Sequence, residues 1–276
     1  MNTWTTTRRG FLKAGAVAAG TLALGTRGAL AADEAYGGFR MGAQSYSFRN
    51  FDYKGAIERL KQLGLNNIEY CSVHFPPVTG HENFPEVHGY IKESGVNPVC
   101  YGVESFSDNV EASRLKFEFG KAMGLELITA NPMRNAFDSL EALTEEYGIG
   151  IAIHNHGPGA DYDGVRDTLK AVEGRSPLIG ACVDTGHVIR SGEKPHEVIR
   201  ELGSRVLSLH LKDWIHGGEE QILGEGDLDL VEVAKALKEI NFKGPLNLEF
   251  ELSPEDPVPG MAKGLENWKQ AVASIA

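Results

Sequence analysis

The stretch IGIAIHNH, residues Ile149–His156, decides how the chain folds. Read as an extended strand, it points alternate side chains to opposite faces. One face then carries three isoleucines, and the other carries Ala152, His154 and His156. Such alternation is typical of a half-exposed sheet, unless other elements enclose the polar face.

Three later stretches repeat this pattern of one apolar and one polar face: LIGACVDTGH (178–187), RVLSLHLKD (205–213) and GPLNLEFEL (244–252). Their polar faces carry metal-capable residues at or near the C-terminal end, namely Asp184, His210 and Glu249. Amphipathic helical segments separate the strands, and this alternation requires parallel strands with helices on the apolar face. We therefore expect the polar residues to converge at the C-terminal mouth of a barrel, where barrel enzymes place their chemistry.

The same alternation extends over the rest of the chain and predicts eight strands and eight helices. The expected strands cover residues 38–47, 67–71, 98–104, 125–131 and the four stretches above. The expected helices lie at about 52–63, 85–94, 109–124, 139–147, 164–173, 195–202, 228–240 and 261–274, with a glycine-rich acidic loop at 217–226. We predict an α/β protein, a (β/α)8 TIM barrel forming a single domain over residues 38–276, since such barrels typically need about 250 residues.

The first 31 residues are expected to lie outside this fold. Thr7–Lys13 (TRRGFLK) has the pattern of a twin-arginine export signal, followed by an apolar run, Ala14–Leu24, and a small-residue site, Ala29–Ala31. The run is too short and too rich in glycine and alanine for a stable membrane span. We predict cleavage after Ala31, the twin-arginine export machinery as a partner and a periplasmic or other extracytoplasmic location. The alternative is an uncleaved anchor.

The charge of the remaining chain disfavours nucleic acid as a partner. All four basic residues of the signal are lost with it, so 23 of the 27 lysines and arginines remain against 38 acidic residues, a formal charge of −15. Such a chain repels nucleic acid and anionic membranes. Three cysteines, Cys71, Cys100 and Cys182, fall in expected strands, and their odd number favours small core-filling residues over disulfides.

The converging side chains form a mixed nitrogen and oxygen ligand set: His154, Asp184, His210 and Glu249. This set suits one divalent ion such as Mn, Co, Fe, Zn or Mg. Open positions on the ion can accept a substrate carbonyl and an adjacent hydroxyl. A lone strand-end acid usually caps a loop and a lone histidine is usually structural, but four at equivalent strand ends favour a metal site.

Other polar residues near these strand ends are candidates for substrate binding. His187, three residues after Asp184 on the following loop, can bind substrate, orient a ligand or make a structural contact. Lys212 is expected either to approach substrate oxygens or to pair with Asp213. His156 and His216 complete the candidates, and plain surface exposure is an equally good interpretation for His216.

Four motifs occur in an order that resembles the xylose isomerase-like barrel superfamily, often called sugar phosphate isomerases and epimerases: CVDTGH (182–187), HLKD (210–213), GEGDLD (224–229) and NLEFE (247–251). The resemblance covers about residues 38–276. It implies a (β/α)8 barrel with one divalent metal, bound by Asp184, His210 and Glu249, and substrate contact for His187. The fold alone does not fix the reaction.

The chain departs from this family at the end of the fifth strand. The family commonly has a glutamate there that is both ligand and base, in an ENH-like motif, whereas this chain has His154 in HNH. A neutral imidazole makes the site one unit more positive and removes one of the two opposed bases that an epimerase normally uses. Glu104, at the end of the third strand, is either a replacement base or ligand or a carboxylate at the rim.

One base beside a carbonyl-polarising metal suits aldose–ketose isomerisation, with Glu249 as the base and His154 as its catalytic co-ligand. It suits equally well the removal of an α-proton followed by loss of a β-substituent, which resembles the family's lyases that open 3-keto-glycosides. Gly157–Gly159 lacks the glycine-rich loop and lysine of a phosphate cradle. An unphosphorylated sugar or glycoside is therefore the expected substrate.

Two functions of other classes fit the same barrel. A metal-dependent phosphodiesterase resembling endonuclease IV needs a richer metal cluster and a basic surface for DNA, which the net charge disfavours. A non-catalytic periplasmic sugar-binding protein would keep the barrel and lose its activity together with the strand-five glutamate.

Overall fold

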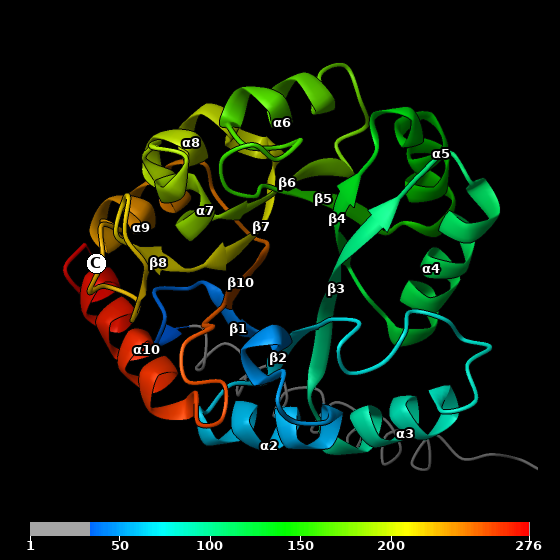
Figure 1. The fold of residues 1–276 in the computed structure, drawn as a ribbon, viewed down its shortest axis with the longest axis horizontal. Helices are drawn as coiled ribbons and strands as arrows, with labels where there is room; N and C mark the ends of the chain where they lie inside the picture. Colours follow the sequence, from blue (N-terminus) through cyan, green and yellow to red (C-terminus); the bar gives the residue numbers. More distant parts are fainter. Residues whose placement is uncertain (1–33, 276) are drawn as a thin grey trace, which may run out of the picture.

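Eight parallel strands form a closed barrel in the computed structural model, which describes residues 34–275 (Figure 1). Around the barrel the strands follow the order β1-β10-β7-β6-β5-β4-β3-β2. Their bounds are Arg40–Gln44 (β1), Asn67–Tyr70 (β2), Asn97–Phe106 (β3), Leu127–Pro132 (β4), Gly150–His154 (β5), Ile179–Asp184 (β6), Val206–Leu211 (β7) and Pro245–Leu248 (β10). The predicted single-domain TIM barrel is thereby confirmed, while the predicted signal peptide, residues 1–31, lies outside the described residues.

Helices connect successive strands and surround the barrel (Figure 1). They are α2 (Tyr53–Gln62), α3 (Phe84–Ser94), α4 (Val110–Met123), α5 (Phe137–Tyr147), α6 (Val165–Val172), α7 (Thr185–Arg190), α8 (Pro195–Leu202), α9 (Leu230–Glu239) and α10 (Val258–Ala273). Local sequence explains their ends. Asp52 accepts the Gly55 N–H at 2.8 Å and begins α2, and Gly64, with φ of 73°, follows its end because glycine adopts positive φ without strain.

Two elements differ from the prediction. Asp184 ends β6 and caps α7, because its Oδ1 accepts the His187 N–H at 2.8 Å, so His187 lies in a helix rather than in a loop. The predicted loop 217–226 contributes one strand to an antiparallel hairpin of β8 (Asp213–Trp214) and β9 (Glu220–Gln221). These elements have six and two residues, which is too short for hydrophobic periodicity to reveal.

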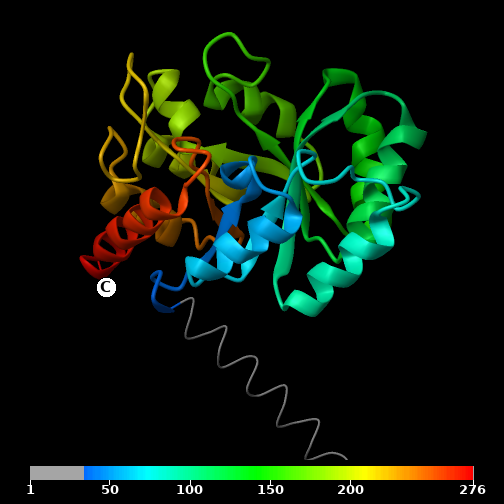
Figure 2. The ribbon, with the colours of Figure 1, turned by 60° about the horizontal axis from the view of Figure 1, so that its bottom comes forward.

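The apolar faces of the strands pack under the helices as predicted, and Leu209 and Leu246 are fully buried. The three cysteines are free and buried, as expected. Figure 2 shows the β8–β9 hairpin and the loop after β5 on the same side of the barrel. Within residues 34–275, no helix has the length and apolarity that a membrane crossing requires.

Candidate metal centre

The C-terminal ends of four strands bring together the four side chains that the sequence predicted as ligands. His154 is the last residue of β5, Asp184 the last of β6, His210 lies in β7, and Glu249 directly follows β10. All four are buried, and each offers one ligand atom within 4.8 Å of the other three. Strand register contributes directly, because Asp184 and His210 are paired residues of neighbouring strands.

Nitrogen and oxygen atoms of these residues face a common point. The Nδ1 of His210 lies 3.0 Å from the Oε2 of Glu249 and 3.1 Å from the Nε2 of His154. The Nε2 of His154 lies 3.5 Å from the Oδ2 of Asp184. That Oδ2 is buried and has no hydrogen-bond partner among the described residues. Burying an unpartnered oxygen costs free energy, and a bound cation would remove this cost. Two imidazoles and two carboxylates therefore fit one divalent ion.

A carboxylate outside the four-residue cluster orients His210 through the other nitrogen of its ring. Glu69, in β2, is fully buried, and its Oε2 lies 3.0 Å from the Nε2 of His210. The same oxygen accepts the side-chain N–H of Asn247 at 2.8 Å. This contact leaves the Nδ1 of His210 as the metal-facing atom, as in carboxylate–histidine–metal triads. Glu69 is not among the residues predicted for the site, although Asn67 and Glu69 alternate with Ile68 and Tyr70 as the predicted ligands do with their neighbours.

Burial sets the protonation states of the centre. It lowers the pKa of His154, whose imidazole is therefore neutral and able to bind a metal. For His210, burial also disfavours the charged form, but the neighbouring Cys182, Glu69 and Glu249 outweigh it and raise the pKa well above its usual value. Burial raises the pKa of Glu249, yet Lys212 and His210 outweigh it and lower that pKa to about 2. Glu249 is thus ionised at neutral pH.

Three of the predicted substrate-binding residues lie beside the cluster. The ring of His154 lies 4.6 Å from that of His156 and 5.7 Å from that of His187, measured between centroids. Lys212 is only 1% exposed, and its Nζ lies 3.7 Å from the Oε1 of Glu249. It pairs with Glu251 rather than with Asp213, the alternative that the sequence suggested.

The other two candidates lie elsewhere. His216 is exposed, and its Nδ1 contacts the carbonyl of Ile189 at 2.9 Å. Its contact with substrate stays a prediction. Glu104 forms an ion pair with Lys116 of α4 at 2.6 Å and is not a member of the four-residue cluster. Glu104 therefore does not replace the strand-five glutamate as a ligand in this structure.

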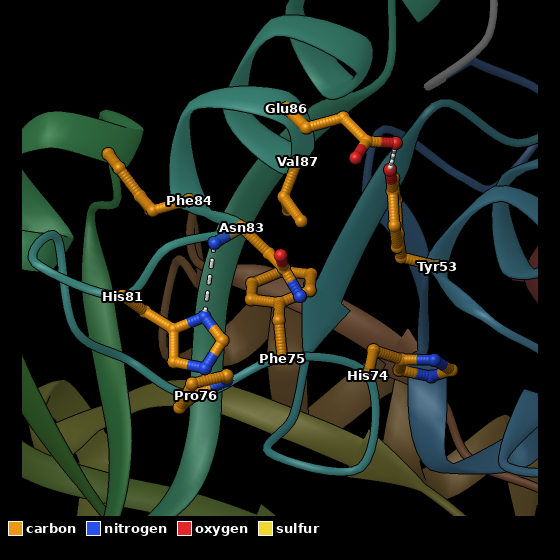
Figure 3. A pocket seen from close by; sticks show the side chains of 9 residues that line it. All are labelled: Tyr53, His74, Phe75, Pro76, His81, Asn83, Phe84, Glu86 and Val87. Atoms are coloured by element: carbon orange, nitrogen blue, oxygen red, sulfur yellow. Dashed lines mark hydrogen bonds between the residues drawn. The ribbon is translucent and has the colours of Figure 1, made fainter.

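A separate small pocket lies beside the loop between β2 and α3 (Figure 3). Its volume is about 160 Å³, and its aromatic lining includes Tyr53, Phe75 and Phe84. Tyr53 donates a hydrogen bond to Glu86 at 3.0 Å at one end of the pocket. None of the four clustered residues lines it, so it is distinct from the metal centre.

Comparison with known proteins places this centre in a family context. Residues 129–271 match a family described as xylose isomerase-like TIM barrel. Inosose dehydratase from Clostridium botulinum is 28% identical over a 161-residue alignment that covers 51% of this chain and 54% of that protein. The chain thus spans about half the length of the curated relatives it matches.

Solved structures extend the likeness to most of the chain. An uncharacterized protein from Parabacteroides distasonis is 28% identical, with a TM-score of 0.66 over 83% of this chain and 97% of that one. The IOLI protein, whose crystal structure contains a bound zinc atom, has a TM-score of 0.70 over 86% of this chain and 99% of its own. It is 16% identical, so this second likeness shows the fold alone.

Proposed function

Because the chain belongs to the xylose isomerase-like TIM barrel family, we propose that it is a divalent-metal-dependent enzyme that removes a proton next to the carbonyl of a sugar. The observation that carries this proposal is the buried cluster of two imidazoles and two carboxylates at the mouth of the barrel. The name of one relative, inosose dehydratase, indicates that it removes water from an inosose, and this supports a carbonyl-bearing polyol as the substrate of the present chain.

The cluster residues divide the work between holding the ion and moving a proton. His154, Asp184, His210 and Glu249 would hold the metal, which when bound polarises the substrate carbonyl and acidifies the neighbouring C–H. Glu249 is the proposed base because it is ionised and buried within the cluster. Lys212, 3.7 Å from its Oε1, orients this carboxylate and is close enough to contact a substrate oxygen.

We propose elimination as the fate of the deprotonated sugar. His154 stands where the family commonly has a second carboxylate, so the centre has one base and removes and returns protons on one face. Loss of a hydroxyl or alkoxy group from the β-carbon needs only one such base, because the carboxyl group that takes the α-proton can return it to the departing oxygen, which leaves as water or an alcohol. The dehydratase name of the relative supports this outcome. Aldose–ketose isomerisation is the second candidate, favoured by the same single base.

The substrate and location follow as further proposals. The short loop Gly157–Gly159 has no phosphate-cradling pattern, which supports an unphosphorylated sugar or glycoside. The twin-arginine pattern Thr7–Lys13 supports export to an extracytoplasmic compartment, where such glycosides occur. N-terminal sequencing of exported protein tests the location, with Ala32 expected as the first residue.

Solvent deuterium tests the reaction. The metal-loaded protein is incubated in D2O with a panel of keto-sugars and 3-keto-glycosides. Deuterium should enter the carbon next to the carbonyl where the proton is returned, and an elimination product should have lost one water or alcohol. Glu249→Gln should lose turnover by about 10²–10⁴-fold while sugar binding persists, and Glu126→Gln, which changes an exposed carboxylate, serves as the matched control.

Each alternative predicts a different result. A non-catalytic sugar binder shows no deuterium exchange and tolerates Glu249→Gln. An enzyme resembling endonuclease IV cleaves abasic DNA and leaves the sugars unchanged. Either of these outcomes refutes the proposed lyase or isomerase activity.

A further inference from the structure

Arg190 presents a positively charged group beside the metal centre. It is the last residue of α7, which Figure 1 places between the barrel and α8. Its guanidinium donates to the Nδ1 of His187 at 2.8 Å and lies 4.9 Å from the centroid of the Trp214 ring. A Cβ atom on Gly157 would come within 2.8 Å of the Arg190 Cζ, so the glycine backbone packs closely against the guanidinium. These three contacts hold the charge in one place.

No carboxylate among the described residues neutralises this guanidinium at ion-pair distance. The acids of the adjoining loops have other partners. Asp163 accepts the N–H of Gly159 at 3.0 Å and the hydroxyl of Ser191. Glu193 accepts the N–H of Val165 at 3.0 Å. A guanidinium has five N–H donors, and hydrogen bonding to His187 uses only one of them.

The contact with His187 links Arg190 to the metal centre. Because Arg190 donates to Nδ1, the neutral His187 ring carries its proton on Nε2. Burial lowers the pKa of His187, which keeps the ring neutral. The ring centroid of His187 lies 5.7 Å from that of the candidate ligand His154. One imidazole, that of His187, therefore links the guanidinium to the candidate ligand His154.

We propose that Arg190 binds an anionic group of the substrate, a carboxylate, while the sugar carbonyl lies at the metal centre. This inference rests on the proposed function and specifies its substrate class as an acidic sugar. The planar fork of arginine matches such oxygen pairs, and charge-assisted bonds of this kind are about twice as strong as neutral ones. An anion would also neutralise the guanidinium in a strongly acidic chain.

A binding comparison on one sugar scaffold tests this inference. D-glucose, D-glucuronate and D-glucose 6-phosphate differ only at the sixth carbon, and each is titrated calorimetrically into manganese-loaded protein at constant ionic strength. We expect D-glucuronate to bind 10-fold or more tightly than glucose. Tighter binding of glucuronate supports the carboxylate site, whereas a preference for the phosphate ester over glucuronate overturns it and contradicts an unphosphorylated substrate.

Two variants separate recognition from general electrostatics. Arg190→Gln should weaken binding of the preferred anionic sugar by about 10- to 100-fold and leave glucose binding within twofold. Gly157→Ala should weaken it in part without any change of net charge, because the new methyl group displaces the guanidinium. Lys238→Gln, in the exposed last turn of α9, removes the same unit charge and should have no effect.

If Arg190 only stabilises the loops, the binding measurements should differ from those expected above. Equal or undetectable binding of all three sugars to the wild type overturns the inference, as does an anion preference that survives Arg190→Gln. If the preference is absent while deuterium incorporation depends on Glu249, the inference about Arg190 fails and the proposed function stands. Thermal melting of Arg190→Gln within about 2 °C of the wild type verifies that the variant is folded.

Discussion

Replacing Glu69 by glutamine isolates the contribution of a residue that never touches the metal. The carboxylate is fully buried, and its Oε2 interacts with the Nε2 of His210 at 3.0 Å and with the side-chain N–H of Asn247 at 2.8 Å. Glutamine keeps the size of the side chain and one accepting oxygen. It removes the negative charge that makes the Nδ1 of His210 a better ligand.

We expect Glu69→Gln to weaken metal affinity by about 10- to 100-fold, or about 1.4–2.7 kcal/mol. The variant should still fold, because both of these contacts use the Oε2 of Glu69, while its Oε1, where the new amide NH2 can stand, has no hydrogen-bond partner in the described structure to lose. The loss should therefore appear in metal binding far more than in the melting temperature of the metal-free protein.

Competition with a chelator measures the affinity for Zn²⁺ and Mn²⁺ at pH 7. Glu126→Gln is the control, since Glu126 lies on the surface and pairs with Arg40 at 2.9 Å. An affinity of Glu69→Gln within twofold of the wild type refutes the reasoning, because it means that the carboxylate does not determine how His210 binds. If the melting temperature of the metal-free variant also falls markedly, the loss of metal affinity reflects unfolding, and Glu69 has a purely structural role.

Three further predictions concern the ligands and the hairpin. His154→Glu restores a carboxylate and should shift selectivity from Zn²⁺ toward Mn²⁺ and Mg²⁺ by tenfold or more; unchanged binding and rate would show that His154 is not a ligand. As the pH rises toward the raised pKa of His210, metal affinity should increase about tenfold per pH unit, because metal binding displaces the His210 proton. Calorimetry in buffers of different ionisation enthalpy should detect one released proton. The same proton stabilises the metal-free fold fully below the unfolded pKa, about 6.5, and this contribution is lost as the pH rises through the folded pKa. Asp213→Ala removes the acceptor for backbone N–H groups of Trp214, Gly224, Gly226 and Leu228, at 2.8–3.0 Å, and should cost about 2–3 kcal/mol in urea unfolding; a loss under 0.5 kcal/mol would contradict this role.

The alternation of side chains along each strand predicted the parts of the centre that the barrel strands position. In parallel strands the C-terminal ends meet, so His154, Asp184 and Glu249 could be placed together from their positions alone. The same logic applied to β2 would have found Glu69. It was missed because a lone buried glutamate on a short strand gives no motif.

The loops make side-chain contacts that this alternation along the strands could not predict. Whether Lys212 pairs with Asp213 or with Glu251 depends on how the chain turns after β7, and the structure chooses Glu251. The position of Arg190 depends on α7, whose six residues give no periodic signal, and on the approach of Gly157 from another loop. Such contacts arise from packing between segments that are distant in sequence.

The proton on His210 explains how the centre can exist before a metal binds. Asp184, Glu249 and Glu69 place three buried carboxylates around the two imidazoles of His154 and His210, which would be unstable without a compensating charge. The raised pKa of His210 supplies one positive charge between Glu69 and Glu249, and Lys212 supplies another beside Glu249. A divalent ion would replace the proton and add one net charge, which the unpartnered Oδ2 of Asp184 is placed to share. The histidine in strand five fits this balance because, unlike a glutamate, it adds no fourth carboxylate, and metal entry therefore needs only one proton to leave.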